Sequence, residues 1–207
     1  MAAADGILVR PIAATDIRAL VDLQKASLDG SVITQLGRGF LAAFHAAALE
    51  HPSSHALLAV AGGAIGGFAL ATVDVDAFNS HVKRRVFVPL LRSLAAPRGL
   101  PLMWRFARSL VEPQPEPQMP AELLLLVVDA RYRRRGIGQR LLAEMEQAFV
   151  GDGVARYRVA VRSHLAVAKA FYMATGFERE QDLLVLGQPM TYLIKRIARQ
   201  APACPHR

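Results

Sequence analysis

The stretch "DARYRRRGIGQRLL", residues 129–142, decides the fold of this chain. The apolar run "ELLLLVV" (122–128) ends directly before it and has the length and valine content of a buried central strand. Three arginines and two glycines follow, and the pattern from 136 to 150 is helical. A strand that passes through a glycine turn into a helix leaves unpaired N–H groups at the helix start. Together with the helix dipole, these donors favour a bound phosphate.

Other phosphate-binding folds fit this turn less well. A P-loop requires Lys and then Ser or Thr after its second glycine, where this chain has Gln139 and Arg140. A dinucleotide-binding fold requires a third glycine or alanine, where Leu141 stands, and no acidic residue ends the next strand near Arg162. Nucleic-acid binding could use the arginines, but few aromatic residues accompany them to stack bases. A tight turn with solvated arginines is the simplest alternative.

The composition indicates one globular domain. A chain of 207 residues, 53% hydrophobic and 20% charged, is long enough for a substantial core. Its single cysteine, Cys204, can build neither a disulfide framework nor a cysteine metal site, which fits a reducing compartment. The N-terminus lacks the features of a signal peptide, and no run reaches the roughly 18 apolar residues of a spanning helix. We therefore expect a cytoplasmic protein.

The net charge of +8 is unevenly distributed. Between residues 80 and 111 there is no acidic residue, and seven basic ones occur: Lys83, Arg84, Arg85, Arg92, Arg98, Arg105 and Arg108. A solvated basic face is the plain interpretation, and an anionic substrate, a membrane surface or an acidic partner protein are the alternatives. Apolar residues in 76–111 recur at helical spacing and are interrupted by Pro89, Pro97 and Pro101. Short packed helices that form a lid over the substrate site are therefore favoured over one long interfacial helix.

The remaining pattern predicts an α+β fold around one mixed sheet. An edge strand and two helices come first, followed by a hairpin of two strands joined by "GG". After the insert, strand, helix, strand, helix and a final pair of strands follow. The expected elements are 7–12, 15–28, 33–50, 55–61, 64–75, 122–128, 136–150, 156–163, 164–176, 177–186 and 190–197.

Two motifs resemble those of the GNAT (GCN5-related) N-acetyltransferase family. The family's Q/R-x-x-G-x-G/A at a strand-to-helix junction is matched by "RRRGIG" (133–138), and "VVDARY" resembles its V-x-P-x-Y approach, with Ala130 in place of proline. "AKAFYMATGF" (168–177) resembles A-x-x-[LF]-Y-x-x-x-G-F. The resemblance covers nearly the whole chain. It implies one domain over 1–197, with a helical basic insert at 76–120 and a flexible tail at 198–207. The implied sheet is mostly antiparallel, with one splayed parallel strand pair, and is flanked by helices.

The resemblance also implies that acyl-CoA, most simply acetyl-CoA, lies in the wedge between the two splayed strands. Main-chain groups of Val127 and Val128 would pair with its pantetheine arm, and the Val128 N–H could polarise the thioester carbonyl. Ala168, which opens the second motif, is expected to contact the cofactor. Arg133 would add positive charge beside the pyrophosphate, which would be held by the main-chain N–H groups of Arg134, Arg135, Gly136, Ile137, Gly138 and Gln139.

Two residues are implied as catalytic. Tyr172 occupies the family's tyrosine position, from which a phenol can donate a proton to the leaving CoA thiolate; simple packing is the alternative. Glu122 stands eleven residues before Arg133, where the histone-acetylating branch of the family carries its glutamate base. It could act directly or through water, and an exposed glutamate without a role is the alternative. The rival bases are Asp74, Asp76, His45 and His81.

One position departs from the family pattern. The family often has Asn seven residues before the tyrosine, where this chain has Leu165. A contact between that Asn side chain and CoA is therefore expected to be lost, and Ser163 or His164 could cap the helix instead.

These observations predict an N-acyltransferase in which a neutral amine attacks the thioester directly. Small-molecule amines, amino sugars, peptides and protein N-termini stay open as acceptors, and a non-catalytic acyl-CoA-binding sensor is the alternative function. No metal is expected, because no cluster of His, Asp, Glu and Cys has ligand spacing. We expect no nucleic-acid partner, the basic insert leaves a membrane surface open, and a homodimer is a further possibility.

Overall fold

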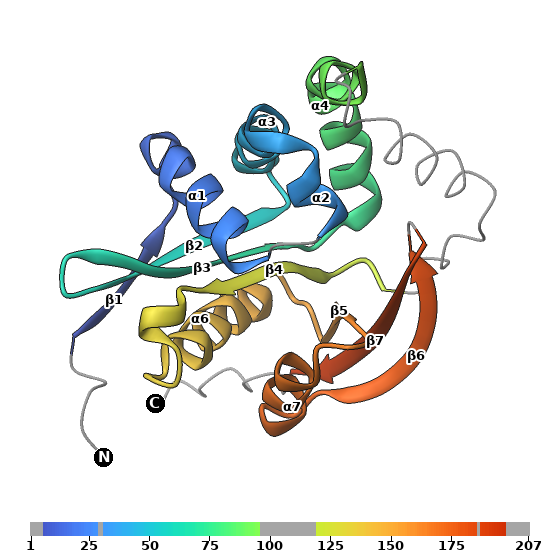
Figure 1. Cartoon of the computed structure of the whole chain (residues 1–207). Coiled ribbons are helices and arrows are strands. Elements are labelled where there is room, and N and C mark those ends of the chain that lie inside the picture. The colour runs from blue at the N-terminus through green and yellow to red at the C-terminus, as the bar shows by residue number, and fades with distance from the viewer. Residues whose placement is uncertain (1–5, 29–30, 96–118, 186, 198–207) are drawn as a thin grey trace, which may run out of the picture.

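A computed structural model describes residues 6–28, 31–95, 119–185 and 187–197. These residues form one seven-stranded sheet with helices on both of its faces (Figure 1). The strand order is β1-β2-β3-β4-β5-β7-β6, and every neighbouring pair is antiparallel except β4 and β5. The predicted fold class, α+β around one mixed and mostly antiparallel sheet, is confirmed.

The N-terminal half follows the predicted order of elements. The predicted helix 33–50 is divided in two, because α2 ends at Gln35 and α3 begins at Gly37. Gly62 and Gly63 both have positive φ (58° and 78°), as a tight hairpin turn between β2 and β3 requires. The elements are β1 (Ile7–Pro11), η1 (Ala14–Asp16), α1 (Ile17–Ser27), α2 (Val32–Gln35), α3 (Gly37–Glu50), β2 (Ser54–Ala61), β3 (Ala64–Thr72) and α4 (Val75–Ala95).

Helix α4 departs from prediction. Pro89 lies inside this 21-residue helix, so the expectation that it separates short helices is wrong. Proline removes one helical N–H donor, but the buried side chains of Phe78, Val82 and Val86 hold α4 against α3. The rest of the predicted lid, including Arg98, Arg105, Arg108, Pro97 and Pro101, lies outside the described residues, as does the predicted tail 198–207 with Cys204.

The C-terminal half contains the strand in the centre of the sheet. β4 lies between β3 and β5, and the chain crosses from β4 to the parallel β5 through α6. Gly176 (φ 91°) follows the end of α7, as expected for a helix stop. The elements are β4 (Glu122–Val128), η2 (Ala130–Tyr132), α6 (Ile137–Gly151), β5 (Arg156–Arg162), α7 (Ala166–Ala174), β6 (Glu178–Val185) and β7 (Gln188–Arg196).

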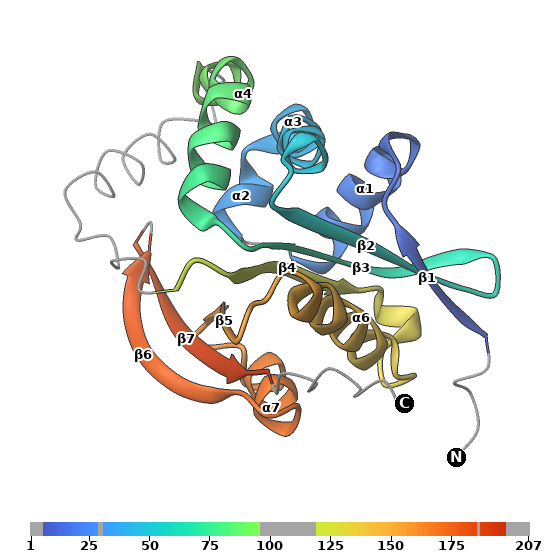
Figure 2. The same ribbon diagram turned by 180° about the vertical axis from the view of Figure 1, so that it is seen from behind.

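The helices divide between the two faces of the sheet. Helices α1 to α4 cover one face, and α6 and α7 lie on the other, which the view from behind also shows (Figure 2). Leu123 and Val159 pack into the core beneath α6 and α7, whereas Phe68 and Val127 pack into the core beneath α1. Strand β4 therefore contributes side chains to the cores on both faces of the sheet.

A half-buried polar cluster fixes α6 to the C-terminal strands. The Tyr157 hydroxyl donates to Glu146 Oε1 at 2.5 Å, and Lys195 Nζ donates to the same oxygen at 2.6 Å. The three residues come from β5, α6 and β7. This cluster orients α6, whose N-terminus begins the glycine turn.

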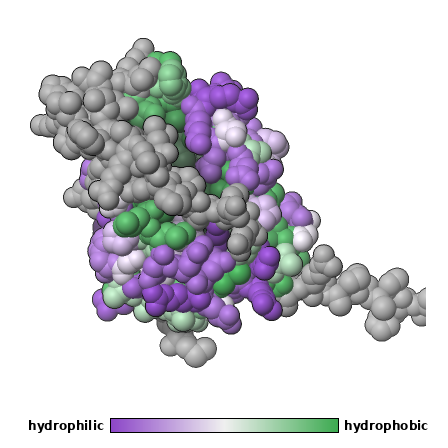
Figure 3. All heavy atoms as spheres, turned by 90° about the vertical axis from the view of Figure 1, so that its right-hand side faces the viewer, coloured by the Kyte–Doolittle hydropathy of each residue, from purple (hydrophilic) through white to green (hydrophobic). Residues whose placement is uncertain are grey.

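The two edges of the sheet differ in their protection. Pro11 ends β1, and proline has no N–H to offer a further strand. Strand β6, at the other edge, exposes a run of mostly charged residues: Glu178, Arg179, Glu180, Gln181 and Asp182. From the side where β6 and β7 lie, hydrophilic residues cover much of the described surface (Figure 3).

Within the described ranges, no helix combines the length and apolarity needed to cross a membrane.

One buried histidine links α1 to α3. His45 is 3% exposed, and its Nε2 lies 2.7 Å from Oε1 of the fully buried Gln24. Burial lowers the pKa of His45 from 6.5 to about 4. The folded chain therefore keeps this imidazole neutral at pH values where the unfolded chain protonates it.

This difference predicts a loss of stability in mild acid. As the pH falls from 6.5 to about 4, the unfolded chain gains a proton on His45 that the folded chain does not. The free energy of unfolding should drop by roughly 3 kcal/mol across this window on that account. Urea unfolding at pH 7 and pH 4.5 measures the drop, and His45→Gln, which keeps a polar partner for Gln24 but does not titrate, is the control. Equal pH dependence in the two proteins would contradict the prediction.

Candidate functional site

The parallel strands β4 and β5 pair over only two positions. Glu122 lies opposite Arg158 and Leu123 opposite Val159, and no further pair follows. On the other side of β4, Leu70 pairs with Leu125 and Ala71 with Leu123, so Leu124 is an extra residue in a bulge. A bulge bends its strand and increases the local twist. The strands therefore part from Leu124 onward, as the predicted splay requires.

The alternation along β4 decides which main-chain groups face this gap. The Asp129 N–H donates to Gly66 O of β3 at 2.9 Å, so residue 129 faces β3. Because alternate residues of a strand face the same side, Val127 also directs its main-chain groups to β3, and Leu126 and Val128 direct theirs to the gap. The contact predicted for Val128 therefore fits the geometry, whereas that predicted for Val127 does not. Leu126, which the motif did not identify, is a further candidate for a main-chain contact and also lines the cavity described below.

A cavity of about 230 Å³ occupies the gap and reaches both faces of the sheet. On the α7 face it is lined by Val161, Leu165, Ala168 and Tyr172, and on the α1–α4 face by residues that include Leu28, Leu124 and Met190. Ala168 and Tyr172, two of the predicted site residues, therefore line the same cavity. The stretch of β4 that lines it is Leu124 to Leu126, so the cavity lies closer to the point of parting than Val128.

The turn between β4 and α6 has main-chain donors directed outward. The sign of φ alternates here: Arg134 (φ 60°) and Gly136 (φ 84°) are positive, and Arg134 is the one non-glycine residue with positive φ among the described residues. Such alternation makes successive N–H groups converge on a concave surface that suits an anion. The Arg140 N–H makes the first i→i−4 bond of α6, to Gly136 O at 2.9 Å. Ile137, Gly138 and Gln139 therefore begin the helix with N–H groups that have no partner within it.

The two glycines of the turn are needed for different reasons. A Cβ at Gly136 would meet nothing within 4 Å, but the left-handed backbone there disfavours other residues. Gly138 has an ordinary backbone, and its Cβ would lie 3.3 Å from the ring of Phe171 on α7. The second glycine therefore lets α6 approach α7.

The arginines give the turn a positive field. The exposed Arg133, Arg134 and Arg135 form no ion pair with a described carboxylate, whereas Arg131 pairs with Asp129 at 2.7 Å. Arg133 Nε donates a long hydrogen bond, 3.4 Å, to Val128 O, and the Arg135 guanidinium lies 5.7 Å from the centroid of the Tyr132 ring. Free cations beside outward N–H groups are what binding of a phosphate requires.

Tyr172 is held in place from two sides while its hydroxyl stays free. Its ring, 6% exposed, packs edge-on against Phe171 and Phe177 at centroid distances of 5.2 and 5.1 Å. The hydroxyl makes no hydrogen bond to any described residue, and the side chain lines the cavity. Burial raises the pKa of Tyr172, so its hydroxyl keeps its proton at neutral pH.

Glu122 lies in a buried ion pair. Its Oε2 accepts a hydrogen bond from Arg158 Nε at 2.8 Å, and the two side chains are 13% and 7% exposed. The Arg158 guanidinium also lies 5.1 Å from the centroid of the Tyr192 ring. Burial raises the pKa of Glu122, and Arg158 opposes this rise. Glu122 is not among the described residues that line the cavity, so direct contact with an acceptor has no support in this geometry.

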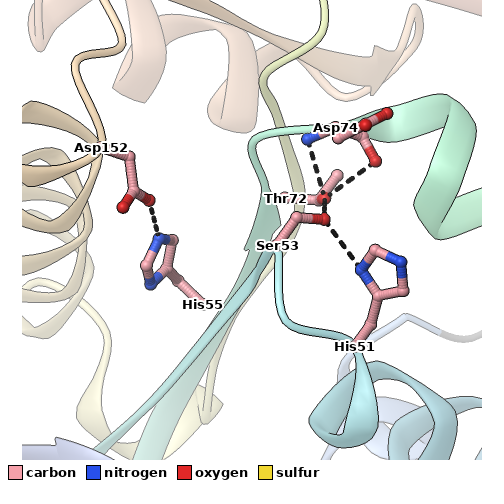
Figure 4. A network of polar contacts seen from close by, with 6 residues as sticks. All are labelled: His51, Ser53, His55, Thr72, Asp74 and Asp152. Carbon is pink, nitrogen blue, oxygen red and sulfur yellow. Dashed lines mark hydrogen bonds and ion pairs between the residues drawn. The ribbon is translucent and has the colours of Figure 1, made fainter.

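The rival bases lie in other parts of the chain. His45 is buried against Gln24, and Asp74 accepts the Ala77 N–H at the start of α4. Figure 4 shows Asp74 beside Thr72, Ser53 and His51, whose side chains form a chain of hydrogen bonds. Asp76 is exposed, and His81 lies near Glu50. None of the four rivals is among the described residues that line the cavity.

The start of α7 lacks a side-chain cap at the position where the family often has Asn. Leu165 is the N-cap residue and makes no capping hydrogen bond. Ser163 does not replace the cap, because its hydroxyl pairs with Thr191 Oγ1 of β7 at 3.1 Å.

In the described parts of the chain, no group of three or more His, Cys, Asp and Glu side chains could hold a metal ion.

Comparisons with known proteins agree with this geometry. Residues 116–185 match the family model described as an acetyltransferase (GNAT) domain. This segment spans β4, the glycine turn, α6, β5, α7 and β6. A search of curated proteins found no match.

Solved structures resemble the whole chain at low sequence identity. PaiA N-acetyltransferase from Thermoplasma acidophilum, in complex with coenzyme A, has a TM-score of 0.60 and 16% identity over 92% of this chain and 99% of that one. The ribosomal-protein-S18-alanine N-acetyltransferase from Escherichia coli gives 0.60 and 16%, over 97% and 99%. The ribosomal-protein-alanine N-acetyltransferase from Brucella melitensis gives 0.61 and 16%, over 92% and 99%. At these identities, the likeness establishes the fold.

Proposed function

We propose that the chain transfers an acetyl group from acetyl-CoA to a primary amine, because residues 116–185 match the acetyltransferase (GNAT) domain model and the fold resembles that of solved N-acetyltransferases. The enzyme class, acetyltransferase, comes with the family. The acyl donor, the acceptor and the role of each residue are the proposal. The observation that carries it is a cavity between two parted strands that contains a buried tyrosine whose hydroxyl bonds to none of the described residues.

The N-terminus of α6 would hold the pyrophosphate of the donor. Outward N–H groups, the helix dipole and the charges of Arg133 to Arg135 favour it there. The donor supplies an activated acyl group as a thioester. Main-chain groups of Leu126 and Val128 would pair with its pantetheine arm, because β5 does not bond to them. A main-chain N–H from this part of β4 would polarise the thioester carbonyl, and removing one such donor typically lowers kcat by about 10²- to 10³-fold.

The reaction is a direct acyl transfer. The amine nitrogen attacks the carbonyl carbon, a C–N bond forms and the C–S bond breaks, and the proton lost by the amine ends on the CoA sulfur. Tyr172 would donate its hydroxyl hydrogen to the departing sulfur, and the proton that the amine loses to the base would return to the Tyr172 oxygen through water, so that the net transfer is from nitrogen to sulfur. Because burial keeps this phenol protonated, it offers a donor at any pH near neutrality.

The amine must lose a proton, and Glu122 is our candidate to receive it through water. Its buried carboxylate lies at the start of β4, beside the point where the strands part. The ion pair with Arg158 gives Glu122 a structural role that is independent of catalysis.

The acceptor class is open among small amines, peptides and protein N-termini. Two of the similar structures bear names that specify a ribosomal-protein alanine, which makes a protein N-terminus one candidate. The alternative function is a sensor that binds acyl-CoA without turnover. Both functions predict binding of acetyl-CoA, but only an enzyme releases free thiol when an amine is added. A screen of amines for thiol release therefore decides between them, and absence of release with every class would favour the sensor.

The first prediction concerns the glycine turn. Gly136→Val must adopt a strained left-handed backbone, and Gly138→Val must displace Phe171. Both changes should weaken acetyl-CoA binding at least roughly tenfold, because one oriented N–H to an anion contributes about 1.5–3 kcal/mol. Calorimetric titration measures the affinity. Gly151→Ala, at the other end of α6 and without strain or contact, is the matched control and should bind normally. Wild-type affinity in both valine variants would remove the phosphate from this turn.

The second prediction concerns Tyr172. Tyr172→Phe removes one hydroxyl that bonds to no described residue, so folding should be little affected. If the hydroxyl assists the leaving group, kcat should fall about 10²-fold or more, while KM for acetyl-CoA stays similar. Tyr157→Phe is the control, because that buried hydroxyl bonds to Glu146 and lies outside the cavity. It should lose stability but keep kcat. A normal kcat in Tyr172→Phe would reduce this residue to packing.

The third prediction separates the two roles of Glu122. Glu122→Gln leaves Arg158 buried without a counter-charge, which should lower the free energy of unfolding by about 3 kcal/mol. If Glu122 is also the base, the acidic limb of the kcat/KM profile against pH should disappear, since that limb reports its protonation. Unfolding and pH–rate measurements on the same protein test both. An unchanged profile in a destabilised protein would leave only the ion pair.

A further inference from the structure

The cavity crosses the sheet, and this separates two routes of entry. Val161, Leu165 and Tyr172 line it on the face of α6 and α7, beside the turn that we assign to the donor. Leu124 and Leu28 line it on the face of α1 to α4. If the acyl donor enters from the α6 side, the acceptor approaches from the α1–α4 side. The chemistry of that second opening therefore bears on what the acceptor is. This inference rests on the proposed function.

The second opening is mostly apolar. Its described lining includes Leu28, Ile33, Leu125, Val185 and Met190, from the ends of α1 and α2, β4 and the β6–β7 hairpin. No described carboxylate lines the cavity. A cationic acceptor such as a polyamine, whose second ammonium group needs an anionic partner, would find none among these residues.

One charged residue stands among the described lining, Arg162 at the end of β5. Arg162 is half-buried and pairs through its backbone with Met190 of β7. Its guanidinium forms no ion pair or hydrogen bond with any described residue. Arg158, four residues earlier on the same face of β5, differs in both respects, because it bonds to Glu122 and lies over Tyr192. Of these two arginines, Arg162 is the one whose whole guanidinium is unpaired among the described residues and that lines the cavity.

We propose that Arg162 binds a carboxylate of the acceptor, and that the acceptor is an α-amino acid with an apolar side chain. A guanidinium can hold a carboxylate through two parallel hydrogen bonds, which fixes the direction of the attached amine as well as its position. The leucine, isoleucine and methionine side chains of the opening would cover an apolar substituent. A protein N-terminus has a peptide group where a free amino acid has its carboxylate, so Arg162 disfavours that alternative acceptor.

The test compares two ligands that differ in this one group. Binding of L-leucine and of L-leucinamide to the CoA-saturated protein is measured by calorimetry, for wild type and for Arg162→Gln. Loss of a charge-assisted pair should weaken L-leucine binding roughly 10- to 100-fold and leave L-leucinamide nearly unchanged. Arg162→Lys should restore part of the loss, because it keeps the charge without the planar fork. Arg156→Gln, on an exposed position of the same strand outside the cavity, is the control.

The outcomes separate this inference from the proposed function. Equal binding of leucine and leucinamide, equal losses for both in Arg162→Gln, or no binding of either would overturn the amino-acid assignment. So would preferred turnover of a leucine-initiated peptide amide. Acetyl-CoA affinity should be the same in wild type and Arg162→Gln, and a large loss there would assign Arg162 to the donor instead. If no amine releases thiol but leucine still binds through Arg162, the proposed acetyl transfer is contradicted and the amino-acid site is not.

Discussion

Two rungs of parallel pairing join the halves of the sheet, and the rest of the site depends on their being only two. Glu122 faces Arg158 and Leu123 faces Val159, after which the strands separate. A fully paired central strand would have no cavity beside it and no main-chain groups to offer. Because buried main-chain groups need partners, the separation leaves β4 with a requirement that water or a bound molecule must satisfy. The requirement begins directly after the pair of Leu123 and Val159, one position beyond the buried ion pair of Glu122 and Arg158.

Much of this arrangement could be predicted from the sequence, because local patterns determine it. The apolar run 122–128, the glycines that follow it and the helical spacing after residue 136 specify strand, turn and helix without knowledge of distant residues. The position of Tyr172 in the cavity could be predicted from the second motif, and the hairpin between β2 and β3 from its two glycines. In each case, a few neighbouring residues carry the information.

Other features depend on residues that are distant along the chain. The partner of Glu122 is Arg158, 36 positions later, and nothing near Glu122 indicates it. The bulge at Leu124 is a property of the pairing between β3 and β4, and it changes which residues face the gap. Pro89 predicts a helix end from its local chemistry. The helix continues through it because side chains of α4 pack against α3, which lies far away along the chain. The packing role of Gly138 cannot be predicted from the sequence, because the Phe171 ring that it faces lies 33 positions later and comes close only in the folded chain.

The contrast between the edges of the sheet and its centre has a consequence for where this protein can recognise another backbone. Pro11 at one edge lacks a donor, and the charged β6 at the other repels an added strand. The unsatisfied main-chain groups that remain attractive lie in the interior, between β4 and β5, where only something as narrow as a single extended chain can enter. The edges of this sheet therefore disfavour the addition of a strand from another molecule. The main-chain groups that can still form hydrogen bonds lie in the gap between β4 and β5, where a thin and flexible molecule fits.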